Sequence, residues 1–129
     1  MMRLLLDTHV LLWAVAESRK LSKATKKLLE DPDNEIWYST ASLWEISIKS
    51  SLRKPNFHID PEVVHGVLSE TGFLELPIRG SHAVAVAKLP DVHRDPFDRM
   101  LAAQALTEPL VLLTNDEILS KYPIQVRMV

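Results

Sequence analysis

The sequence contains no cysteine and only three glycines among its 129 residues. Without cysteine, the chain cannot form disulfides, thiolate metal sites or a thiol nucleophile. Three glycines are also too few for a Walker-type phosphate loop, and no GxGxxG or Gly-x-Ser-x-Gly motif occurs. These absences exclude the common nucleotide-binding and covalent-hydrolase signatures.

Long hydrophobic runs and an excess of positive charge are also lacking. The polar residues 7–9 interrupt the apolar start, and the apolar stretch 10–16 is far shorter than the roughly 20 residues of a membrane span. We therefore expect a soluble, unexported, cytoplasmic protein with no membrane partner, folded as a single domain over residues 1–129. The net charge of −2 argues against nucleic-acid binding. Two bound divalent cations would, however, reverse its sign.

Short apolar runs alternate with amphipathic stretches along the chain. The sequence predicts strands over residues 3–6, 36–38, 73–76, 110–113 and 124–126. It predicts helices over residues 8–16, 22–30, 40–52, 60–71, 81–89 and 95–107. Short connections between alternating strands and helices favour a parallel sheet covered on both faces. The predicted fold is a three-layer α/β/α arrangement with a central parallel sheet of four to five short strands.

Four acidic residues fall at special places in this pattern. Asp7 and Asp116 each follow a predicted strand, whereas Glu45 and Asp98 lie in predicted helices. The carboxyl ends of parallel strands form the edge where open α/β sheets bind ligands. Several carboxylates directed at one edge repel each other unless a cation lies between them. The pattern therefore predicts a divalent-metal site.

Each acid also has a simpler interpretation. Asp7 suits a helix N-cap, and Asp116 suits a turn or a cap for residues 117–121. Glu45 could form an exposed i, i+4 pair with Lys49. Asp95 precedes a proline and is most simply an N-cap. These alternatives remain open at the level of sequence.

Asp98 is the better candidate ligand in its segment. Ala102 and Ala105 lie on the same helix face, and small side chains there allow the helix to approach the sheet closely. The histidines show no paired spacing typical of a zinc site. We expect His58, His65, His82 and His93 to be structural or solvent-facing.

Four segments together resemble the PIN domain family, and specifically its VapC-type toxin ribonucleases. The matching segments are Leu4-Leu5-Leu6-Asp7-Thr8-His9, Ser42-Leu43-Trp44-Glu45-Ile46, His93-Arg94-Asp95-Pro96-Phe97-Asp98-Arg99 and Leu113-Thr114-Asn115-Asp116. The resemblance spans nearly the whole chain in the family's order. It implies a PIN-like fold, hydrolysis of RNA phosphodiester bonds, a cognate antitoxin protein and a homodimer.

The resemblance also implies roles for individual residues. Asp7, Glu45, Asp98 and Asp116 match the acids that hold one or two Mg²⁺ or Mn²⁺ ions. The hydroxyl residues at the family's polar positions are Thr8, Ser39 and Thr114, and Asp95 belongs to the same motif as Asp98. Arg94 and Arg99 flank the predicted cluster and could bind phosphate, or they could be ordinary surface charges.

Two other classes of function are weighed against this hypothesis. A receiver or phosphatase-like phosphotransfer domain also carries acids at strand ends, but a second acid after the first strand is missing in Asp7-Thr8-His9. A non-catalytic α/β binding module could use the tryptophans as a contact surface. Carboxylate-dependent binding of Mn²⁺ would separate the enzyme from such a module.

Overall fold

The computed structural model describes residues 1–53 and 55–129, and a five-stranded parallel sheet forms its centre. The strands are β1 (Arg3–Leu6), β2 (Glu35–Ser39), β3 (Leu74–Leu76), β4 (Val111–Thr114) and β5 (Val126–Met128). Their order across the sheet is β3-β2-β1-β4-β5, and every neighbouring pair is parallel. The predicted parallel sheet is thus confirmed, with five strands.

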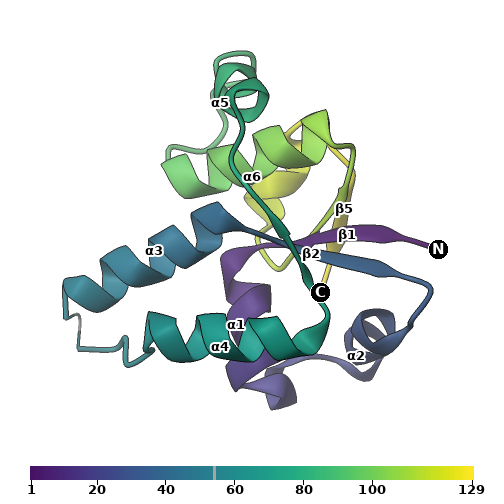
Figure 1. Ribbon diagram of the computed structural model, residues 1–129. Coiled ribbons are helices and arrows are strands. Elements are labelled where there is room, and N and C mark those ends of the chain that lie inside the picture. Colours follow the sequence, from purple (N-terminus) through teal and green to yellow (C-terminus); the bar gives the residue numbers. More distant parts are fainter. Residues whose placement is uncertain (54) are drawn as a thin grey trace.

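Helices cover both faces of the sheet, which gives the predicted three layers (Figure 1). The α-helices are α1 (Thr8–Ala16), α2 (Lys23–Glu30), α3 (Thr40–Ser51), α4 (Pro61–Thr71), α5 (Gly80–Val86) and α6 (Pro96–Thr107). Two 3₁₀ helices, η1 (Ser18–Lys20) and η2 (Glu117–Lys121), complete the elements. In Figure 1, α5 and α6 lie above the sheet, α1, α2 and α4 lie below it, and α3 contacts both α4 and α6.

Alternation along β1 divides the core between the two faces. Leu5 lies opposite Trp37 and Leu112 in the register, and all three pack on the side of α6. Leu4 and Leu6 point the other way and pack with α1 and α4. Because successive side chains of a strand point to opposite faces, a strand buried on both sides must be apolar throughout. This explains the uninterrupted Leu4-Leu5-Leu6 run.

Helix ends follow the sequence signals closely. The side chains of Asp7, Ser22, Ser39, Asp60 and Asp95 each accept a hydrogen bond from a backbone N–H of the helix that they cap. Pro61 and Pro96 occupy the first helical position, where the missing N–H has no intrahelical partner in any case. Gly72 ends α4 with φ of 81°, in the left-handed region that favours glycine.

Two predicted boundaries were wrong. The helix predicted over 81–89 is α5, which starts at Gly80 and ends at Val86. After it, the Lys88 and Leu89 N–H groups bond to carbonyls three residues back, so the chain leaves the helix through tight turns. The strand predicted over 124–126 is β5 at Val126–Met128. A turn bond from the Ile124 N–H to the Tyr122 carbonyl delays pairing with β4.

The buried His82 links α5 to α6, in agreement with the structural role expected for it. Its Nδ1 accepts a hydrogen bond of 2.9 Å from the Arg79 N–H at the start of α5. Its Nε2 pairs with the carboxylate of Glu108, the C-cap of α6. None of the helices among the described residues is long and apolar enough to cross a membrane.

Candidate metal centre

Asp7 lies where the strand order reverses. β1 has β2 and β3 on one side and β4 and β5 on the other, and Asp7 directly follows β1. Its Oδ1 accepts a 2.8 Å hydrogen bond from the Val10 N–H, which caps α1. Its Oδ2 accepts a hydrogen bond from the hydroxyl of Thr114 at the end of β4. Asp7 therefore bridges the two halves of the sheet at the point where α/β folds bind ligands.

Burial disfavours ionisation of the Asp7 carboxyl group. Asp7 is only 4% exposed, and this desolvation raises its pKa. The hydrogen bonds from Thr114 and Val10 oppose that effect, while the charge of Asp116 adds to it. Asp7 is thus a helix cap, as the simpler interpretation held. It is also a buried carboxyl group that shares its surroundings with another acid.

Glu45 is buried, so the side of α3 that carries it does not face open water. Its side chain is 7% exposed, and Oε1 accepts a 2.8 Å hydrogen bond from the hydroxyl of Thr8. The same hydroxyl lies 2.9 Å from Oγ of Ser42. Glu45 Oε2 pairs with Lys49 Nζ at 2.8 Å, so the expected i, i+4 pair is present, although its acidic partner is buried.

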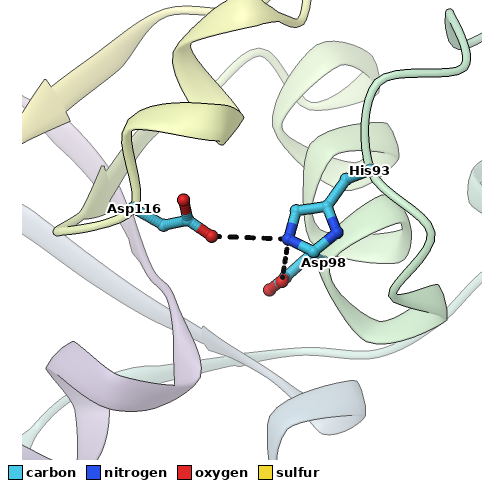
Figure 2. A group of neighbouring side chains, drawn as sticks. All are labelled: His93, Asp98 and Asp116. Carbon is cyan, nitrogen blue, oxygen red and sulfur yellow. Dashed lines mark ion pairs between the residues drawn. The ribbon is translucent and has the colours of Figure 1, made fainter.

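Asp98 and Asp116 meet around the imidazole of His93 (Figure 2). His93 Nε2 lies 3.1 Å from Asp98 Oδ2 and 3.4 Å from Asp116 Oδ2. Asp98 comes from the first turn of α6, Asp116 follows β4, and His93 belongs to the loop before α6. One donor atom from each residue lies within 4.8 Å of the others, so these three residues could share a metal ion.

The pKa of Asp98 links this trio to the other two acids. Burial, and to a smaller extent the charges of Asp95, Glu45 and Asp7, together raise that pKa to about 7, although His93 lowers it. Charges affect one another in this way only at close range. Since Asp116 also raises the pKa of Asp7, the four predicted acids influence one another's ionisation, whereas the residues whose donor atoms lie within 4.8 Å of one another are His93, Asp98 and Asp116.

The donor set suits a hard divalent cation. Carboxylate oxygens are the ligands that Mg²⁺ and Mn²⁺ prefer, and a dication would offset both the burial and the neighbouring negative charges that raise the pKa of Asp98. The His93 Nδ1 accepts a 3.2 Å bond from the Asp95 N–H. In a neutral ring this leaves the proton on Nε2, directed at Asp98 and Asp116. A cation bound between these carboxylates would therefore compete with the His93 ring for the same oxygens.

Sequence reasoning missed His93, which was expected to be structural or solvent-facing. Spacing could not reveal it, because its partners come from α6 and from the end of β4. The loop that carries it is held by the Tyr122 hydroxyl, which accepts a 3.0 Å bond from the His93 N–H. The only local signal is its position within the His93-Arg94-Asp95-Pro96 segment, next to the predicted cap.

The secondary candidates have distinct surroundings. Ser39 is fully buried and caps α3, and Asp95 caps α6. The Arg99 guanidinium donates to the carbonyls of Val86 at 3.0 Å and Pro90 at 3.1 Å, so it supports the loop before α6. Arg94 is exposed beside the cluster.

Several solved structures share this fold. A chain of the DNA-bound VapBC2 complex from Rickettsia felis matches with a TM-score of 0.74 and 17% identity, over 98% of both chains. The DNA-bound VapBC complex from Salmonella typhimurium gives 0.71 and 17% identity, over 99% of this chain and 98% of that one. VapBC-1 from nontypeable Haemophilus influenzae gives 0.64 and 17% identity, over 98% of both.

A comparison with curated proteins finds no match. The family described as PIN domain matches residues 4–125. This match runs from β1 to the residue before β5 and includes all four acids and His93. The chain belongs to the PIN domain family.

Proposed function

We propose that this protein is a metal-dependent endoribonuclease and acts as the toxin of a VapBC-type toxin–antitoxin pair. The observation that carries the proposal is the coupling of four carboxylates at one edge of the sheet, beside its topological switch point. Membership of the PIN domain family and the fold shared with chains of VapBC complexes support it. We expect the protein to act in the cytoplasm.

Asp7, Asp98 and Asp116 are the proposed metal ligands, and Glu45 completes the site. One or two Mg²⁺ or Mn²⁺ ions would stabilise charge on the scissile phosphate. They would also lower the pKa of a water molecule, so that it could lose a proton and attack the phosphorus. Asp7 is the central ligand because it lies between the strand ends and its charge affects Asp98 directly. We assign to Glu45 the role of orienting the attacking water.

The remaining residues hold these carboxylates in place. Thr114 donates to Asp7 and also accepts a 3.0 Å bond from the Asp116 N–H, so one hydroxyl fixes two proposed ligands. Thr8 holds Glu45, and Ser39 fixes the start of α3, on which Glu45 lies. His93 holds a proton at Nε2 beside Asp98 and Asp116, within reach of an oxygen bound at the centre.

An exposed apolar face beside the site supports the proposed homodimer. Trp44 is 59% exposed and packs edge-on against Phe97, with ring centroids 5.3 Å apart. These rings and Ile78 line a groove of about 340 Å³ between α3, α5 and α6. An exposed patch of this kind is typical of a protein–protein contact. Light scattering of wild type and a Trp44→Glu variant would test the dimer, and the cognate antitoxin is the second proposed partner.

The cleavage of RNA provides the main test. Wild-type protein should cut a cellular RNA pool with Mg²⁺ or Mn²⁺, and EDTA should stop the reaction. Asp7→Asn should abolish cleavage while the fold persists, since asparagine caps helices as well as aspartate does. Asp33→Asn, in the exposed turn before β2 and so at the amino end of the strands, is the matched control and should cleave normally. Cleavage by a folded Asp7→Asn protein would contradict the proposal.

A further inference from the structure

A groove lies between α1, α3 and the loop into α4. It has a volume of about 200 Å³, and its lining includes Thr8, His9, Trp13, Lys20, Lys49 and Asn56. Pockets that enclose a drug-sized ligand measure roughly 300–1,000 Å³. The smaller size suits a short stretch of an extended chain better than an enclosed small molecule.

The side chains of the groove combine aromatic rings with cations. The rings of His9 and Trp13 lie 6.3 Å apart, and their planes are tilted by 49°. Lys20 and Lys49 add positive charge, and Asn56 adds an amide. Aromatic faces on which bases stack, next to cations that contact phosphates, are the features of sites for single-stranded nucleic acid.

The one carboxylate among the described lining residues is already neutralised. Glu17 lies 3.0 Å from Lys20 and 3.7 Å from Arg19. Such surface pairs contribute little, so Lys20 can exchange this partner for a phosphate at small cost. Lys49 is paired with Glu45, but Arg19 can keep Glu17 neutral, so Lys20 is available to a phosphate although the chain as a whole carries −2.

Two residues that line the groove contact Glu45. Thr8 lines it and donates to Glu45, and Lys49 lines it and pairs with the other oxygen of Glu45. The exposed His9 is close enough to lower the pKa of Asp7. A nucleic-acid strand whose phosphate reached the carboxylates could extend directly into this groove.

We propose that this groove binds the unpaired RNA segment next to the scissile phosphate, with a base against His9 and Trp13 and a phosphate at Lys20. This inference rests on the proposed ribonuclease function and specifies its substrate as single-stranded at this position. A paired base presents no free face for stacking, so a duplex should bind less tightly.

Binding measured in an Asp7→Asn background tests the groove without cleavage. The probe is a fluorescently labelled uridine strand of about 12 nucleotides, a length within the range of single-stranded sites, followed by anisotropy. His9→Ala should weaken binding at least about fivefold, and His9→Tyr, which keeps an aromatic face, should restore it. Lys20→Ala should weaken binding and reduce the slope of log K against log salt by about 0.7, as expected for one lost phosphate contact.

Lys27→Ala is the matched control because Lys27 is an exposed cation of α2 outside the lining of the groove. Its affinity and salt slope should remain those of the parent. Equal affinities for the His9, Lys20 and Lys27 variants would overturn the inference, and this is also the result expected if the groove serves a protein partner. Metal-dependent cleavage by wild type is scored separately. If wild type cleaves RNA normally but the His9 and Lys20 variants bind RNA as well as the parent does, the groove proposal is refuted and the nuclease proposal stands.

Discussion

Asp98→Asn should stabilise the metal-free protein at alkaline pH. In an unfolded chain an aspartate ionises near pH 4, whereas folded Asp98 keeps its proton to about pH 7. Between these values the folded state binds more protons, so its stability falls as the pH rises through this window. Asparagine carries no charge and avoids that loss. The expected gain is therefore absent near pH 4 and complete above pH 7.

The size of the gain follows from the shift in pKa. About three units at 1.36 kcal/mol each give an upper limit of about 4 kcal/mol. Solvent reaches 22% of the Asp98 side chain and lessens the cost of ionising it, so we expect about 2 kcal/mol at pH 8.

Urea denaturation in EDTA at pH 4.5 and pH 8 measures the effect. The exposed Asp91→Asn, from the same connecting segment, is the control and should show no pH-dependent difference from wild type. Added Mg²⁺ should stabilise wild type at pH 8 and leave Asp98→Asn unchanged, because only binding to the native state shifts unfolding. If Asp98→Asn proved less stable than wild type at pH 8 without metal, burial and the neighbouring acids would not disfavour the ionised Asp98, and the reasoning would fail.

Three further substitutions probe the scaffold. Thr114→Val leaves the buried Asp7 oxygen and the Asp116 N–H without their hydrogen-bond partner. It should lower the free energy of unfolding in urea by about 1–3 kcal/mol and weaken Mn²⁺ binding measured by calorimetry. An unchanged Mn²⁺ affinity would show that Thr114 does not position the ligands. Leu112→Ala should lower the unfolding free energy by about 2–5 kcal/mol, because Leu112 is fully buried in the sheet, and a smaller loss would indicate a loosely packed core. Gly72→Ala should lower it by about 1–2 kcal/mol, since φ is 81° there, and calorimetric melting would reveal a neutral effect if the turn relaxes.

Local chemistry made most of the scaffold predictable from sequence. The Leu4-Leu5-Leu6 run must be buried on both faces, so it could only be a central strand of a covered sheet. The Asp60-Pro61 and Asp95-Pro96 pairs marked helix starts because a cap and a proline solve the same problem of unpaired N–H groups. Asp7 followed from these facts, since a helix cap directly after a central strand lies at the sheet's ligand edge.

Long-range contacts made the rest unpredictable. The position of His93 depends on how the loop before α6 is held by Tyr122 and Arg99, and neither contact leaves a periodic signal. The burial of Glu45 depends on Thr8 from another helix, so the pattern of α3 alone allowed an exposed stripe equally well. The shift of β5 came from a turn at Tyr122 that hydrophobicity does not reveal.

The position of a bound ion tests the central claim most directly. Crystals soaked in Mn²⁺ and measured at the manganese absorption edge should show an anomalous peak coordinated by carboxylate oxygens of Asp7, Asp98 and Asp116. His93 should have moved off at least one of its two carboxylate partners. An ordered peak away from these side chains would contradict the assignment. So would the lack of any peak in wild-type crystals soaked at a saturating concentration of Mn²⁺.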